Sequence, residues 1–171
     1  MGGRYHFEDD WQFADSQIVT YTFPNNITVQ WEGRSCNNYG VYGEPNGVMY
    51  SGTKGTIRIL PENDKYVAYD LKNKVIKSYE GEVIDDPNHM GGGGLDLKHF
   101  TNFAAAIRDG KASPAPLIQG AISTSLCHLG NISQKLGRTI KVDPKNGKIL
   151  DDAEALKMAT RKYQPGWEPK V

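Results

Sequence analysis

The densest group of hydrogen-bonding side chains in this 171-residue chain follows an alternating, strand-like run. Its members are Arg34, Asn37, Asn38 and Tyr39. Ligands rich in hydroxyl groups, such as sugars, are bound by amides, charged groups and an aromatic ring on which they can pack. The pattern therefore predicts a substrate-binding site, and a solvated polar loop at a sheet edge is the alternative interpretation.

Two of the four histidines are further candidates for substrate contacts. His6 lies among acidic and aromatic residues, and His89 lies in a loop that ends in four glycines. A histidine titrates near neutral pH, so His6 could act as a general acid or base. The alternative is a solvated polar residue at a strand edge. His99 and His128 fall on expected helices, where local hydrogen bonding or packing is the expected role.

No metal or nucleotide site is predicted. The histidines lack metal-ligand spacing, and Cys36 and Cys127 are too far apart to form a zinc-type pair. We expect two buried free thiols, with a disulfide left open. The run Gly52 to Thr56 superficially suggests a phosphate loop, but a strand rather than a helix follows it, which favours a hairpin turn. We name no catalytic and no cofactor-binding residue.

Composition excludes several classes of protein. Twenty basic and twenty acidic residues cancel, and they are interspersed along the chain, which argues against a nucleic-acid or membrane-surface partner. No apolar run reaches the roughly 18 residues of a transmembrane helix. With 38% hydrophobic residues the chain is of the globular class, and its length suits one domain. The cellular compartment, cytoplasmic or periplasmic, stays open.

The first half of the chain reads as three β-hairpins. Residues 17–23 are rich in Val, Thr, Tyr and Phe, and in residues 27–32 apolar and polar side chains alternate. A Pro-Asn-Asn turn lies between the two runs. Residues 48–51 and 56–60 flank a glycine-containing turn, and residues 66–70 and 75–79 flank Lys72 to Lys74. Sequential hairpins predict an antiparallel sheet with one face free for helices or for a partner.

The second half reads as helical. Residues 81–95 predict a long mobile loop. Asp96 is the expected cap of a helix that Gly110 ends, and a second helix spans about 117–136 before Gly137. We expect a short strand at 138–142, then a helix at 153–160 with Asp151 and Glu154 as its capping box. Strands followed by helices predict the α+β class: an open, mainly antiparallel sheet with helices on one face.

Several motifs, taken in order, resemble one family. They are Gly2-Gly3-Arg4-Tyr5, Asp9-Asp10, Trp31 to Arg34, Tyr50 to Thr56, His99 to Phe103, Ile107 to Lys111, and Leu129 to Ser133. Together they resemble the C-terminal domain of the glucose–fructose oxidoreductase, inositol dehydrogenase and MocA (Gfo/Idh/MocA) family. The resemblance covers nearly the whole chain and rests on the order of the motifs rather than on any single one.

The resemblance implies a substrate-binding and oligomerisation domain, residues 1–171, of a two-domain oxidoreductase. The family's Rossmann domain binds NAD or NADP, and that domain, the Glu-Lys-Pro motif with its catalytic lysine and the Asp-x-x-x-His helix are absent here. The chain alone is therefore expected to be inactive. The implied partners are a sugar or polyol and further copies of the chain, as a homodimer or homotetramer through the sheet face.

Two alternatives stay open. One is a stand-alone carbohydrate-binding or assembly module, with Trp31, Tyr21 and Tyr69 as an aromatic platform on the sheet. The other is the C-terminal part of an NAD-dependent glycoside hydrolase, since some members of the same family use NAD in that reaction.

Overall fold

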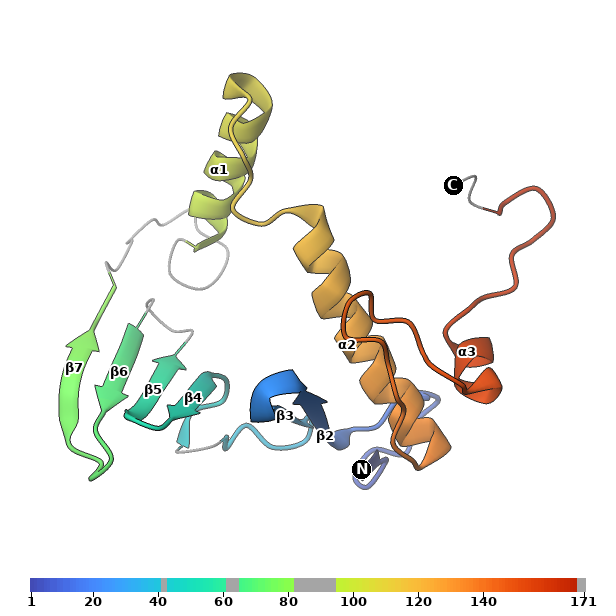
Figure 1. Ribbon diagram of the computed structural model, residues 1–171, viewed down its shortest axis with the longest axis horizontal. Coiled ribbons are helices and arrows are strands. Elements are labelled where there is room, and N and C mark those ends of the chain that lie inside the picture. The colour runs from blue at the N-terminus through green and yellow to red at the C-terminus, as the bar shows by residue number, and fades with distance from the viewer. Residues whose placement is uncertain (41–42, 61–64, 82–94, 169–171) are drawn as a thin grey trace. The chain divides into compact units, whose positions relative to one another are not determined.

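The structure, a computed structural model, describes residues 1–40, 43–60, 65–81 and 95–168 (Figure 1). The chain divides into two compact units. Unit 1 is built from Met1–Cys36 together with Ala115–Val171, and unit 2 is Asn37–Pro114. The expected single domain spanning residues 1–171 stays a prediction.

Unit 1 contains a three-stranded antiparallel sheet. Its strands are β1 (Gly2–Gly3), β2 (Ser16–Phe23) and β3 (Ile27–Arg34), and β2 lies in the middle. The turn η1 (Pro24–Asn26) joins β2 to β3, and Asn25 adopts a left-handed φ of 63°, which asparagine tolerates better than most residues. The hairpin expected at 17–32 is confirmed.

Helix α2 (Leu117–Leu136) packs on the sheet of unit 1 through three long-range hydrogen bonds to main-chain carbonyls (Figure 1). Gln17 donates to the Gly130 carbonyl at 3.4 Å, Tyr21 to that of Leu126 at 2.8 Å, and Gln134 to that of Gly2 at 3.0 Å. Each bond joins residues more than a hundred positions apart, so the helix is tied to β1 and β2 at several points. Gly137 ends the helix in the left-handed conformation, as expected.

A small apolar core lies where α2 meets α3 (Ala153–Met158). Its buried members are Ile132, Ile149 and Ala155. The strand expected at 138–142 is wrong, because only Val142 forms a β-bridge, to Ile149. The Ser133 hydroxyl donates to the Arg138 carbonyl, and this local bond competes with strand pairing.

The cap of α3 lies one residue later than expected. Asp152, not Asp151, accepts the hydrogen bond from the Ala155 N–H at 3.0 Å. Asp151 has a left-handed φ of 50°, and Arg138 binds both carboxylate oxygens of Asp152, which selects Asp152 as the capping residue.

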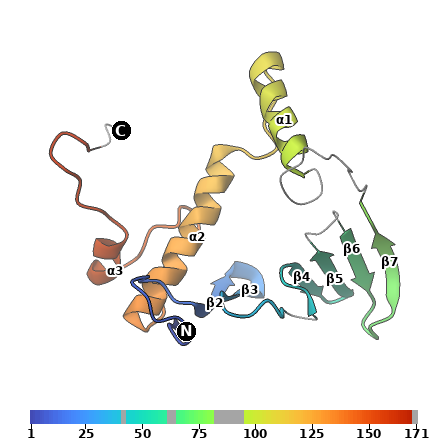
Figure 2. The same cartoon turned by 180° about the vertical axis from the view of Figure 1, so that it is seen from behind.

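Unit 2 contains a four-stranded antiparallel sheet, seen from behind in Figure 2. The strands are β4 (Val48–Gly52), β5 (Gly55–Leu60), β6 (Lys65–Tyr69) and β7 (Val75–Tyr79), in that order across the sheet. Both expected hairpins are confirmed. Helix α1 (Leu95–Asp109) includes Asp96 in its first turn, so the cap expected there is wrong.

The chain is therefore of the α+β class, with two antiparallel sheets and helices that follow them. The loop expected at 81–95 lies almost wholly outside the described residues.

Candidate substrate site

The described site residues predicted from the sequence fall in two different units of the chain. Arg34, at the end of β3, and His6 belong to unit 1. Asn37, Asn38 and Tyr39 are the first residues of unit 2. His89 lies outside the described residues. His6 and Arg34 are therefore compared within unit 1, and Asn37, Asn38 and Tyr39 within unit 2.

Arg34 is exposed, and its Nε lies 3.1 Å from Oε1 of Glu32, two residues back along the same strand. An exposed ion pair of this kind adds little stability but restricts the side chain. The guanidinium group therefore remains accessible at the end of β3.

Asn37 and Tyr39 make a local turn in unit 2. The Tyr39 N–H donates to Oδ1 of Asn37 at 2.8 Å, and the Tyr39 side chain is 70% exposed. This geometry is an Asx turn, in which the amide oxygen is used by the backbone rather than by a ligand. It agrees with the polar-loop interpretation of Asn37, while Asn38 and Tyr39 stay exposed.

The best-defined polar contact of unit 1 is made by Asp15, a residue that the sequence did not single out. Its side chain is buried, with 4% exposed. The carboxylate accepts hydrogen bonds from three consecutive backbone N–H groups, those of Tyr5, His6 and Phe7, at 2.9–3.2 Å. The contact with His6 is the shortest, at 2.9 Å.

These contacts stabilise the ionised form of Asp15. The N–H of His6, with lesser contributions from those of Phe7 and Tyr5, lowers the pKa of the carboxyl from 3.8 to about 2, although burial acts in the opposite direction. The carboxylate is therefore charged at neutral pH and holds the backbone on which His6 is carried.

Asp15 also connects His6 to the strand end that carries Arg34. The Ser35 N–H donates to the Asp15 carbonyl at 2.8 Å, and the Asp15 N–H donates to the Gly3 carbonyl at 3.1 Å. In the sheet register Ser16 is opposite both Gly3 and Arg34. His6 and Arg34 thus belong to segments that meet at one end of the sheet, with Asp15 between them.

Of the three aromatic residues expected to form a carbohydrate-binding platform, only Trp31 is exposed. Trp31 is 50% exposed, whereas Tyr21 is partly buried and donates its hydroxyl to Leu126. Tyr69 is partly buried in β6. Cys36 and Cys127 are free, as expected, but both are exposed, so the expectation that they are buried is wrong.

The described residues were searched for a metal-binding group and for a membrane-spanning helix. No group of three His, Cys, Asp or Glu in the described ranges could hold a metal ion. None of the helices described is long and apolar enough to cross a membrane.

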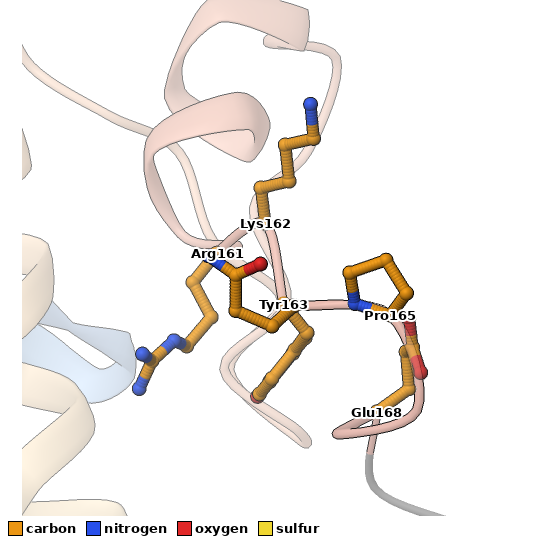
Figure 3. A pocket seen from close by; sticks show the side chains of 6 residues that line it. Arg161, Lys162, Tyr163, Pro165 and Glu168 are labelled. Atoms are coloured by element: carbon orange, nitrogen blue, oxygen red, sulfur yellow. The ribbon is translucent and has the colours of Figure 1, made fainter.

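A surface hollow lies in the C-terminal segment and is lined by Arg161, Lys162, Tyr163, Gln164, Pro165 and Glu168 (Figure 3). All come from one short stretch of chain, and the Arg161 guanidinium lies 5.1 Å from the centre of the Tyr163 ring. None of the predicted site residues lines it, so it is a bend of the segment rather than the expected substrate site.

Comparison of the chain with protein-family models, with curated proteins and with solved structures finds no match.

Proposed function

We propose that this chain is the substrate-binding and oligomerisation part of an NAD(P)-dependent sugar or polyol oxidoreductase of the Gfo/Idh/MocA type. The proposal starts from the resemblance of its motifs to that family. One structural observation supports it most directly. Two of the resembling segments, Gly2 to Tyr5 and Trp31 to Arg34, meet at one end of the sheet, where Asp15 is bonded to the first segment and to Ser35, the residue after the second.

The nucleotide is assigned to another domain because the residues described here do not fit it. Gly52 and Gly55 are paired across the hairpin of β4 and β5, and no helix follows them. A dinucleotide site needs a glycine-rich turn between a strand and a helix N-terminus. In the described ranges all named strand pairs are antiparallel. No step of a hydride transfer is therefore derived for this chain.

The sheet of unit 1 also supports association with further copies of the chain. Ile27, Val29 and Trp31 alternate on one face of β3 and are 56%, 46% and 50% exposed. Their partners on β2 are Phe23, Tyr21 and Val19, the face on which α2 packs. Exposed apolar patches often mark association sites.

Association through a sheet face is a proposal, and within unit 1 the two faces of the sheet differ in polarity. The face away from α2 carries Ile18, which is 39% exposed, beside the polar residues Thr20, Thr22, Thr28, Gln30 and Glu32. We place the association surface on the α2-facing side of β3 instead. A homodimer or homotetramer that covers this row of Ile27, Val29 and Trp31 is the proposed assembly.

The proposal is tested by calorimetric titration of the chain with myo-inositol, with methyl β-D-glucopyranoside and with NADH, together with light scattering. We expect weak binding of at least one polyhydroxy compound, no binding of NADH, and a mass above that of the monomer. Tight binding of NADH without binding of either polyhydroxy compound would contradict the domain assignment.

The association surface is tested separately by Trp31→Lys, which places a charge in the apolar row. The control is Gln30→Lys, on the opposite face of the same strand. We expect the first variant to be monomeric and the second to keep the assembly. Equal masses for the two variants would rule out this face. A monomer that still binds sugars would instead favour the stand-alone carbohydrate-binding module.

A further inference from the structure

The segment from Arg4 to Asp15 is a loop whose conformation is held by hydrogen bonds of its own first and last side chains, Arg4 and Asp15. Asp15 binds the N–H groups of Tyr5, His6 and Phe7, as described above. At the other side, the Arg4 guanidinium donates to the carbonyls of Phe7 at 3.0 Å and Phe13 at 3.1 Å. It also donates to Oδ1 of Asp9 at 2.6 Å. The loop is therefore preorganised.

This ordered loop exposes four aromatic side chains. Tyr5 is 75% exposed, Trp11 66%, Phe13 48% and Phe7 40%. The ring of Phe7 lies 4.7 Å from that of His6, and the ring of Phe13 lies 6.3 Å from that of Trp11, centre to centre. One guanidinium binds the carbonyls of both Phe7 and Phe13, so the backbone that carries the two ring pairs is held at both places.

The residues between the rings indicate what this aromatic loop could bind. Glu8, Asp9 and Asp10 follow one another between Phe7 and Trp11, and all three are exposed. Acidic residues are depleted from the cores of protein–protein interfaces, whereas aromatic residues are enriched there. Carboxylates beside exposed rings suit instead a ligand that combines hydroxyl groups with an apolar ring face.

We propose that the aromatic loop is the ring-stacking subsite for a pyranose, with Trp11 as the stacking side chain and Asp9 or Asp10 as the acceptor of sugar hydroxyls. The inference rests on the proposed function and extends it by naming a cyclic sugar as the ligand class. Because the loop is held by Arg4 and Asp15 before binding, little ordering is needed when the ligand arrives.

The test uses the ¹⁵N-labelled chain and methyl β-D-glucopyranoside, with the acyclic polyol sorbitol as the ligand control. The observed signals are the indole N–H resonances of Trp11 and Trp167. Trp167 is the matched control residue, because it is 79% exposed and lies far along the chain from the loop. We expect the glucoside to shift the Trp11 signal and not the Trp167 signal, and sorbitol to shift neither.

Substitutions separate this inference from the proposed function. Trp11→Ala should weaken glucoside binding about tenfold, an effect typical of a lost aromatic stacking contact, and Trp167→Ala should leave it unchanged. Tyr5→Ala provides a second variant of the loop should Trp11→Ala fold poorly. If Trp11→Ala and Tyr5→Ala bind as tightly as the wild type while Arg34→Ala does not, the aromatic loop is not the subsite and the proposed function stands. If the wild type binds no sugar, both proposals fail.

Discussion

The hydroxyl of Tyr21 in β2 donates a 2.8 Å hydrogen bond to the main-chain carbonyl of Leu126 in α2. The two residues are 105 positions apart, and the bond crosses the contact between the sheet and its helix. Gly130, one turn further along α2, is buried at the same contact. The absence of a side chain there lets the tyrosine and the helix approach closely.

Replacement of Gly130 by alanine should therefore destabilise unit 1. An added Cβ would lie 2.8 Å from Oη of Tyr21 and 3.1 Å from Cγ2 of Val19. The gain in helix propensity, about 1 kcal/mol, is opposed by displacement of Tyr21 and loss of its bond to Leu126. We expect a net fall of about 1 kcal/mol in the free energy of unfolding, measured by urea denaturation.

Gly120 provides the matched control in the same helix. A Cβ there would meet nothing within 4 Å. Gly120→Ala should raise the free energy of unfolding by about 0.5–1 kcal/mol, because alanine has the higher helix propensity. If both alanine variants are stabilised to the same degree, α2 does not pack closely on β2.

A second pair of substitutions on α2 tests the position of the core. Ile132 is 6% exposed and packs with Ile149 and Ala155, whereas Ile118 is 68% exposed. Ile132→Ala should lower the free energy of unfolding by about 2–4 kcal/mol through the cavity that it leaves. Ile118→Ala should change it by less than about 0.5 kcal/mol. Similar losses at both positions, again in urea denaturation, would show that the exposed half of α2 is covered in solution.

Asp15 should make stability depend on pH in the acid range. Its pKa is lowered in the folded chain to about 2 from an ordinary value of 3.8, so the ionised form stabilises the fold above pH 4. That contribution is lost as the pH falls from about 4 to about 2. Asp15→Asn should lower the melting temperature by several degrees at pH 7, as followed by circular dichroism.

The difference between Asp15→Asn and the wild type should then shrink as the pH is lowered through this window. Arg138 holds the pKa of Asp152 at about 2 as well, so the melting-temperature difference between Asp152→Asn and the wild type should shrink over the same pH window. A difference that is the same at pH 7 and pH 2 would mean that Asp15 acts through its shape rather than its charge.

Arg138 should hold the start of α3 in place. It donates to both carboxylate oxygens of the capping residue Asp152 and to Oε2 of Glu154 at 3.0 Å. Lysine cannot reproduce this forked geometry, so Arg138→Lys should behave nearly like Arg138→Ala. Hydrogen exchange should accelerate at the amides of Ala155 and Leu156 in both variants, while amides of β2 stay protected. Wild-type protection in Arg138→Lys would show that charge alone is enough.

The local elements could be predicted from the sequence because their signals are local. The alternation of apolar and polar residues after the turn at Asn25 and Asn26 predicted the hairpin of unit 1. Gly137 predicted the end of α2. One error arose because a distant side chain decides between two neighbouring residues. Arg138 selects Asp152 rather than Asp151 as the cap, and no spacing rule contains that contact.

The candidate site was less predictable for the same reason. Asp15 looked like any polar residue before a strand, since its three N–H partners precede it by eight to ten positions. The Arg34 to Tyr39 cluster drew attention by composition alone, yet Asn37 is used in a local turn. A signal that could have found Asp15 is the run of aromatic and acidic residues before it, which needs an internal anchor to stay ordered.

The discontinuity of unit 1 has a consequence for biosynthesis. Strands β2 and β3 leave the ribosome before helix α2, which packs on β2 and follows only after the whole of Asn37–Pro114. At about 5–20 residues per second, the hairpin waits several seconds with the α2-contacting side of β2 uncovered. An isolated two-stranded hairpin is only marginally stable in water. The emerging polypeptide therefore passes through a stage in which Val19 and Tyr21, which contact α2 in the folded unit, are open to chaperones and to neighbouring nascent chains.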